Sequence, residues 1–188
     1  MKNEILYSTK FLDLKVYTKE DGHKWVYAHR PNAKDVVVII PVVKKEDGEY
    51  ILFLITKRPP IFSENKGIFG LETPAGLVGD LNENENILDA IKRELKEETG
   101  YIADEIKIVS RKLSSSAGAT SETSTLAIAY IDSSKTYETA KDDDGGIIVG
   151  RKLVKKENVF DFIKEFEEQN NVIGAQTLSG LFYYFFGK

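Results

Sequence analysis

Three glutamates, Glu94, Glu97 and Glu98, stand close together in a stretch with helical periodicity. Apolar residues around them recur at helical spacing and Gly100 supplies a stop signal, which predicts a helix over about residues 86–99. Residues three and four apart share a helix face, so the three carboxylates project toward one small volume. Like charges this close repel one another and oppose the helix dipole, which predicts a cation beside them.

A divalent metal ion suits this cluster. Arg93 neutralises only part of the charge. Mg²⁺ and Mn²⁺ are hard cations that take oxygen ligands and bind beside substrate phosphates. The chain has no cysteine and two histidines, so any metal must be held by oxygen or by histidine. A solvated helix face is the ordinary alternative in a chain that is 30% charged.

The spacing around the glutamates favours the metal site. A glycine, five residues, a glutamate, seven residues, an Arg-Glu pair, an aliphatic residue, any residue, a Glu-Glu pair, any residue and a glycine follow in order. These positions are filled by Gly79, Glu85, Arg93, Glu94, Leu95, Glu97, Glu98 and Gly100. Seven fixed identities coincide by chance on the order of 10⁻⁸ per start position. The pattern resembles the signature of the Nudix hydrolases, with Tyr101 where an aliphatic residue is usual.

The resemblance implies an α/β (α+β) fold, an α/β/α sandwich around a mixed sheet, and hydrolysis of a nucleoside diphosphate linked to another group. By position, Glu94, Glu97 and Glu98 would hold Mg²⁺ or Mn²⁺. Glu97 and Glu98 would also be catalytic, and Arg93 would orient a glutamate by a salt bridge. Glu85 would belong to the outer part of the site.

A second segment, residues 71–78, resembles the Glu-aliphatic-Pro-Ala-Gly segment of ADP-ribose and related nucleoside diphosphate sugar pyrophosphatases. The resemblance implies that Glu72 and the Ala75 carbonyl face the metal site and that Arg58 contacts substrate. Thr73 replaces the usual aliphatic residue. The implied reaction is cleavage of ADP-ribose into AMP and ribose 5-phosphate.

Residues 5–30 predict a small antiparallel β unit, because Phe11 to Tyr17 alternates and Trp25 to His29 follows an Asp-Gly turn signal. In the subfamily just named, such a unit is exchanged between two subunits and supplies aromatic rings that sandwich the adenine. Phe11 and Trp25 occupy the matching positions, and a small hydrophobic core is their other possible role.

The domain prediction follows from this unit. We expect an N-terminal β unit over residues 1–32, exchanged in a homodimer, and a catalytic domain over residues 33–188. A strand unit this small buries little core alone, and its edge strands need cover.

Two loops complete the predicted site. The loop from Ser116 to Glu122 resembles a Ser-Pro-Gly loop of the subfamily and places Gly118 at the substrate, although Ala117 replaces the proline and puts ADP-ribose specificity in question. A mobile loop before the last strand carries the general base in ADP-ribose hydrolases. The matching loop here offers Asp142, Asp143 and Asp144, with Glu122 and Glu138 in reserve, and a solvated loop tip is the alternative.

The remaining pattern describes the elements around these residues. Strand-like runs occupy residues 36–43, 50–56, 106–113 and 125–131, and amphipathic helices occupy residues 86–99, 156–169 and 175–186. This order fits a mixed sheet layered between helices better than regular βαβ alternation.

Composition excludes several classes of function. A net charge of −4 gives no electrostatic footprint for nucleic acid. No window approaches 18 uninterrupted apolar residues, so we expect a soluble, cytoplasmic protein without a membrane partner. Two other functions stay open. One is the same chemistry on another nucleotide sugar or an oxidised nucleoside triphosphate. The other is a non-catalytic nucleotide-binding regulator, which predicts eroded glutamates, and none is eroded here.

Overall fold

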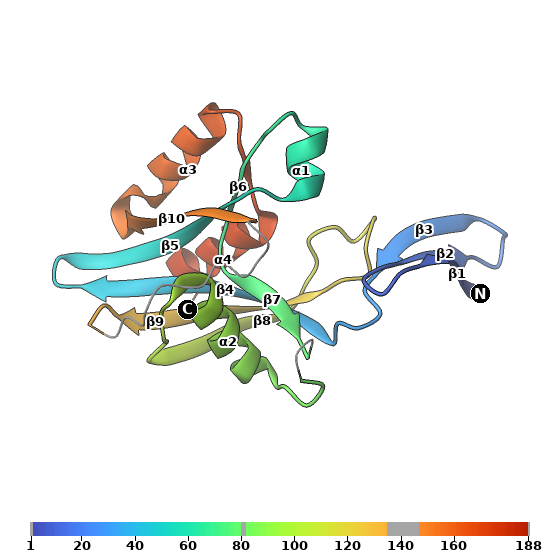
Figure 1. Ribbon diagram of the computed structural model, residues 1–188, viewed down its shortest axis with the longest axis horizontal. Coiled ribbons are helices and arrows are strands. Elements are labelled where there is room, and N and C mark those ends of the chain that lie inside the picture. The colour runs from blue at the N-terminus through green and yellow to red at the C-terminus, as the bar shows by residue number, and fades with distance from the viewer. Residues whose placement is uncertain (1, 80–81, 135–146, 188) are drawn as a thin grey trace.

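The computed structural model describes residues 2–79, 82–134 and 147–187, and these residues form two β-sheets (Figure 1). The smaller sheet is antiparallel and projects from one end of the molecule. It contains β1 (Lys2–Ser8), β2 (Asp13–Thr18) and β3 (Lys24–His29). The larger sheet has eight strands in the order β11-β6-β5-β4-β9-β8, with β10 paired to β5 and β7 paired to β4.

The larger sheet is mixed and lies between helices. Its strands are β4 (Asp35–Lys45), β5 (Gly48–Thr56), β6 (Gly70–Glu72), β7 (Ala75–Val78), β8 (Glu105–Leu113), β9 (Ser124–Asp132), β10 (Ile148–Lys155) and β11 (Val172–Ile173). The helices are α1 (Pro59–Glu64), α2 (Ile87–Thr99), α3 (Val159–Glu168), which follows the 3₁₀ turn η1 (Lys156–Asn158), and α4 (Ala175–Phe186). No helix in the described ranges is long and apolar enough to cross a membrane.

Two hydrophobic cores cover the two faces of the larger sheet. On one face, α2 contributes Ala90, Ile91 and Leu95 to a cluster with residues of β4 and β9. On the other face, α3 and α4 contribute apolar side chains to a cluster with β4 and β5. Figure 1 shows α2 and α3 on opposite sides of the sheet. The predicted α/β/α sandwich around a mixed sheet is therefore confirmed.

Strand β4 organises the sheet around the candidate site. Its run Val36–Val43 is buried throughout, as its continuous apolar sequence predicts. Along one edge it pairs in parallel with β9. Along the other edge it changes partner, because Asp35–Val38 pairs with β7 whereas Val42–Lys45 pairs with β5. This change lays β7 beside α2.

The predicted helices agree with the structure. The helix expected over residues 86–99 is α2, whose N-cap Asn86 accepts a hydrogen bond from the Asp89 backbone N–H at 3.0 Å through its side chain. Its C-cap, Gly100, has φ of 77°, a left-handed conformation that glycine adopts at low cost. The expected helix over residues 175–186 is α4, and the one over residues 156–169 is η1 followed by α3.

Some elements differ from the expectation. The alternating run that starts at Phe11 becomes a strand only at Asp13, because the Thr9 side chain accepts the backbone N–H groups of Phe11 and Leu12 and makes a turn there. Strand β1 precedes this turn and was not delimited by the sequence pattern. The short elements α1, β6, β7 and β11 also lack a periodic signal long enough to read.

Candidate active site

The guanidinium of Arg93 is the hub of the carboxylate cluster on α2. Its Nε and Nη2 donate to the two carboxylate oxygens of Glu85, at 2.8 and 3.0 Å. Its Nη1 donates to Glu94 at 2.7 Å and to Glu97 at 3.1 Å, and its Nη2 also donates to the Leu77 carbonyl at 3.0 Å. Three carboxylates and one strand carbonyl of β7 therefore share one half-buried cation.

This arrangement shifts the pKa values of Glu85 and Arg93. Hydrogen bonds from Arg93 hold the pKa of Glu85 below its ordinary value of 4.5, and a hydrogen bond of 3.1 Å from the Gly79 backbone N–H adds to the effect. The pKa of Arg93 is raised, chiefly by the hydrogen bond to Glu85. Glu85, expected in the outer part of the site, is thus a half-buried anchor of the arginine.

Two other contacts hold the glutamates against β7. Glu98 Oε2 accepts a hydrogen bond from the backbone N–H of Ala75 at 3.0 Å. Glu94 is 8% exposed and lies against Gly76, where a Cβ would stand only 1.8 Å from its Oε1 atom. A side chain at this position would displace the carboxylate from where it stands. The helix and the strand therefore present Glu94 and Glu98 to the same Ala75–Gly76 segment.

The donor atoms of this segment fit a hard divalent cation. The candidate ligands on α2 are the carboxylate oxygens of Glu94, Glu97 and Glu98, and β7 adds the carbonyl of Ala75. Together they form an all-oxygen set of ligands, the kind that Mg²⁺ and Mn²⁺ prefer. Among the described residues, no three carboxylates or histidines are clustered closely enough to form a metal site as they stand. Arg93 binds the side chains of Glu94 and Glu97 instead.

Arg58 and Glu72 form a second charged pair near this segment. Arg58 Nη2 donates to Glu72 Oε2 at 2.9 Å and Arg58 Nε donates to the same oxygen at 3.1 Å. Arg58 precedes α1 and Glu72 ends β6, two elements that the β5–β6 pairing brings together. The structure thus places both predicted substrate residues in one ion pair.

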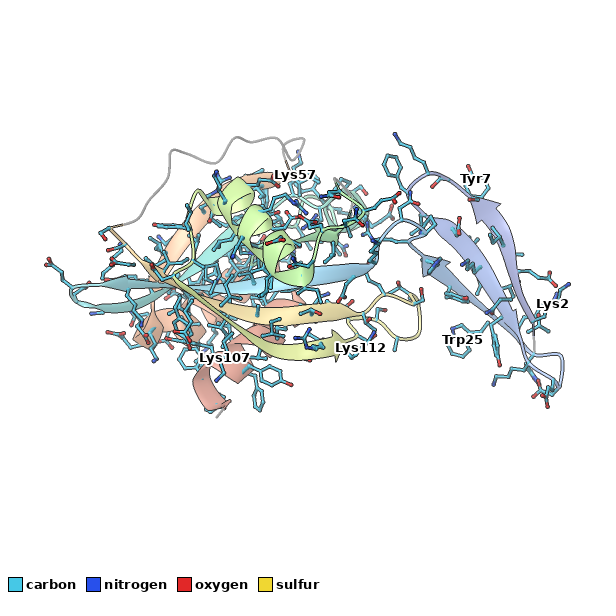
Figure 2. All side chains as sticks on the ribbon, turned by 90° about the horizontal axis from the view of Figure 1, so that it is seen from below. Lys2, Tyr7, Trp25, Lys57, Lys107 and Lys112 are labelled. Carbon is cyan, nitrogen blue, oxygen red and sulfur yellow. The ribbon has the colours of Figure 1, made fainter. Side chains whose placement is uncertain are left out.

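Trp25 contacts the predicted substrate loop. Its indole Nε1 donates to the Gly118 carbonyl at 2.9 Å, and its ring lies 3.8 Å from the position that a Gly118 Cβ would take. Figure 2 shows Trp25 on the small sheet, apart from the eight-stranded sheet. Trp25 keeps 54% of its surface exposed. The Gly118 carbonyl therefore binds the N–H edge of the indole, and much of the ring stays exposed to solvent.

The same strand clamps the rest of that loop. Ala28 exchanges backbone hydrogen bonds with the loop, since its N–H donates to the Ala119 carbonyl at 2.8 Å and its carbonyl accepts from Ser121 at 3.1 Å. Arg30 Nε donates to Glu122 Oε2 at 2.7 Å. Glu122, expected as a reserve base, is held by an arginine of the N-terminal segment.

Other predicted site residues lie elsewhere. Phe11 is 70% exposed in the turn before β2. In the β2–β3 register Trp25 faces Tyr17, about 13 Å along the strand from Asp13, the residue nearest that turn. The candidate bases Asp142, Asp143 and Asp144 and the reserve Glu138 lie outside the described residues.

Sequence reasoning missed three residues that shape the site. Gly76 was given no role of its own within the segment over residues 71–78, although its missing side chain makes room for Glu94. Arg30 and Arg151 were not singled out, although each donates to a residue of the predicted site, Arg151 through a bond of 2.6 Å from its Nε to the Glu98 carbonyl. These contacts join distant segments, and a local sequence pattern carries no signal for them.

Comparison with known proteins defines the class. The NUDIX domain family profile matches residues 33–172, which is most of the chain and includes the carboxylate helix. The chain therefore belongs to the NUDIX family.

Particular relatives agree with this assignment. The chain is 32% identical over 130 residues to a Caenorhabditis elegans protein described as a nudix hydrolase, and 41% identical over 68 residues to an uncharacterized Nudix hydrolase of Schizosaccharomyces pombe. These matches cover 66% and 36% of this chain but 54% and 29% of the relatives, so the chain spans about half or less of their length. The crystal structure of an ADP compounds hydrolase has a TM-score of 0.65, covers 98% of this chain and 90% of its own, and shares 17% identity, which shows the same fold.

Proposed function

We propose that this chain is a metal-dependent Nudix hydrolase that cleaves the pyrophosphate bond of ADP-ribose into AMP and ribose 5-phosphate, or that of a related nucleoside diphosphate sugar into the corresponding nucleoside monophosphate and sugar phosphate. The observation that carries the proposal is the intact carboxylate helix, with Glu94 and Glu98 both seated against Ala75–Gly76. The names of the relatives, two Nudix hydrolases and one hydrolase of ADP compounds, support the reaction class.

We assign metal binding and the orientation of the metal ligands to different residues. Glu94, Glu97 and Glu98, with the Ala75 carbonyl, would hold Mg²⁺ or Mn²⁺. When bound, such an ion screens the charge of the diphosphate and stabilises the leaving phosphate. Arg93 orients the glutamates, since it bridges Glu94 and Glu97 to the anchor Glu85.

The two ends of the substrate are assigned to two further groups of residues. The guanidinium of Arg58 is paired with Glu72 on β6, the strand that precedes β7 and Ala75. A guanidinium at this place is able to donate hydrogen bonds to a phosphate oxygen or a sugar hydroxyl of the substrate. Gly118 and Trp25 form the edge where a flat base stacks on the exposed indole ring. The catalytic base is proposed to be Asp143 or Asp144, because Glu122 is already paired with Arg30.

The N-terminal sheet supports the proposal of a homodimer. Phe11 lies in the turn before Asp13, about 13 Å along the strand from Tyr17, the pairing partner of Trp25, so we propose that a Phe11 from a second copy stacks on the base that Trp25 holds. The sheet also exposes Ile5, Tyr7 and Val26, apolar side chains that a partner would cover. Light scattering at micromolar concentration should give twice 21.2 kDa, and a monomer would contradict the dimer.

The activity is tested with a substrate panel in Mg²⁺ and in Mn²⁺. ADP-ribose, other nucleoside diphosphate sugars and oxidised nucleoside triphosphates are compared, and the products are resolved by chromatography. We expect AMP and ribose 5-phosphate from ADP-ribose in equal amounts. Preferred turnover of another member would move the assignment to that substrate.

A non-catalytic regulator is the other candidate function. It predicts nucleotide binding without turnover of any substrate in the panel. The retention of every signature glutamate favours the enzyme.

A further inference from the structure

We propose that Arg151 is a positioning residue for the carboxylate helix, an inference that rests on the proposed function. Arg151 lies on β10, and its Nε donates a hydrogen bond to the backbone carbonyl of Glu98 at 2.6 Å. This bond joins residues 53 apart in the sequence and connects β10 to the last turn of α2. It fixes the end of the helix that carries a proposed metal ligand.

The end of α2 needs such a donor. The last four carbonyls of a helix have no partner inside it. In α2, the Gly100 backbone N–H donates to the Lys96 carbonyl and the Thr99 hydroxyl donates to the Leu95 carbonyl. The Glu98 carbonyl accepts from Arg151. A guanidinium at this position also complements the negative end of the helix dipole, which the clustered glutamates oppose.

Glu98 is thereby held from two directions. Its carboxylate accepts the backbone N–H of Ala75 on β7, and its carbonyl accepts the Arg151 guanidinium on β10. Arg93, in contrast, holds the side chains of Glu94 and Glu97. The two arginines therefore position different glutamates, Arg93 the pair Glu94 and Glu97, and Arg151 the single residue Glu98. Loss of Arg151 should displace Glu98 and leave the contacts of Arg93 in place.

Strand β10 holds the backbone of Arg151 in a fixed position. It pairs with β5 from Ile148 to Lys155, with a register irregularity between Ile148 and Gly150 just before the arginine. Val154 on the same strand is buried in the core beside α3. The position of Arg151 is therefore set by the sheet, and displacement by a few tenths of an ångström is enough to disturb a metal-ligand geometry.

The test measures binding of the metal alone. Mn²⁺ is titrated into the full chain and the free ion is followed by electron paramagnetic resonance. Arg151→Gln is expected to weaken Mn²⁺ binding about tenfold, the lower end for residues that orient ligands. Lys152→Gln is the matched control, because this neighbouring exposed cation points to the opposite side of β10. It should change binding less than twofold.

Kinetics separate positioning from a structural role. At saturating substrate, Arg151→Gln should need about tenfold more Mg²⁺ for half-maximal rate, while KM measured at saturating Mg²⁺ stays within twofold. Arg151→Lys keeps the charge but shifts the donor atom, so its Mn²⁺ affinity should lie about threefold below that of the parent chain, between the parent and Arg151→Gln. A parent-like Mn²⁺ affinity in Arg151→Gln, or equal losses in Arg151→Gln and Lys152→Gln, would overturn the proposal.

Two further outcomes are decided by the design. If Arg151→Gln fails to fold, Arg151→Lys decides, because its shifted donor should still cost about threefold in Mn²⁺ affinity and an unchanged affinity refutes the role. The Mn²⁺ titration needs no substrate. A chain that binds Mn²⁺ but hydrolyses nothing would refute the proposed function, and the Mn²⁺ affinities of the variants would still test the role of Arg151.

Discussion

Helix α2 and the N-terminal sheet are attached to the protein in opposite ways. α2 buries Ala90, Ile91 and Leu95 completely against the eight-stranded sheet, and Arg93 cross-links its glutamates to β7. The N-terminal sheet leaves six large apolar side chains exposed on its strands, namely Ile5, Leu6, Tyr7, Leu14, Trp25 and Val26. Hydrogen bonds join it to the loop over residues 118–122, and the adjacent Arg30 forms an ion pair with Glu122 of that loop.

Under the proposed function, this difference separates the residues of the chemistry from those that recognise the substrate. The apolar core fixes α2 independently of solvent and partners, which suits groups that must hold a metal within narrow limits. Polar, exposed contacts contribute less, with surface ion pairs worth about 0–1 kcal/mol. The N-terminal sheet is therefore the part of the molecule that a second copy or a substrate is able to stabilise.

The largest expected effect is at the carboxylate helix. Glu98→Gln removes one ligand charge without changing shape, so kcat should fall about a hundredfold or more. The melting temperature should hardly change. Steady-state kinetics at saturating Mg²⁺ test this, and retention of more than about a tenth of the rate, a barrier change under ~1.4 kcal/mol, would rule out a catalytic Glu98.

The next effect is at the N-terminal sheet. Trp25→Ala should raise KM for ADP-ribose about tenfold to a hundredfold, since base stacking contributes roughly 1–3 kcal/mol, and should leave kcat nearly unchanged. Trp25→Phe separates two roles, because it keeps a ring but loses the N–H that binds Gly118.

A near-parent KM in Trp25→Phe supports stacking. A KM as high as that of Trp25→Ala shows that the bond to the loop is what matters. Trp25 is the sole tryptophan, so its fluorescence should also be quenched by ADP-ribose added with Ca²⁺.

A smaller effect concerns stability and pH. Arg93 holds the pKa of Glu85 below 4.5 in the folded chain, so the pair stabilises the fold above that pH and the stabilisation is lost as the pH falls through the folded pKa. Glu85→Gln should lower the melting temperature by several degrees at pH 7. The difference between variant and parent should shrink below about pH 4.5, and a constant difference from pH 7 to pH 3 would contradict the linkage.

The smallest effect is a gain. Thr73 is 2% exposed, and its hydroxyl has no hydrogen-bond partner among the described residues. Thr73→Val removes the buried polar group at nearly constant shape and should stabilise the chain by about 1 kcal/mol, or about 2–4 °C in melting temperature. Thr73→Ser keeps the hydroxyl, so calorimetry should show no gain for it.

The parts of the fold that the sequence predicts are those with local signals. The bounds of α2 and α4 were predicted to within one residue, because amphipathic periodicity and a glycine cap are both visible in a short, continuous stretch of sequence. β7 was missed because Pro-Ala-Gly has the composition of a turn, and it becomes a strand only through pairing with β4. α1 was missed because it is short and opens with two prolines, which the first helical turn accepts.

The candidate site divides in the same way. The glutamates of the signature were identified from spacing alone, and their helix is confirmed. The partners that hold them, Gly76, Arg151 and the Leu77 carbonyl, were not, because each meets its glutamate or arginine only through the tertiary fold. The substrate and the base remain predictions.

The clamp between Trp25 and Gly118 has a consequence for biosynthesis. The two residues are 93 positions apart in the chain. At about 5–20 residues per second on the ribosome, roughly 5–20 s pass between the emergence of the N-terminal strands and that of the loop that receives them. During this interval the strands of the nascent N-terminal sheet, with their exposed apolar side chains, lack the loop they dock on, so this segment needs chaperone protection.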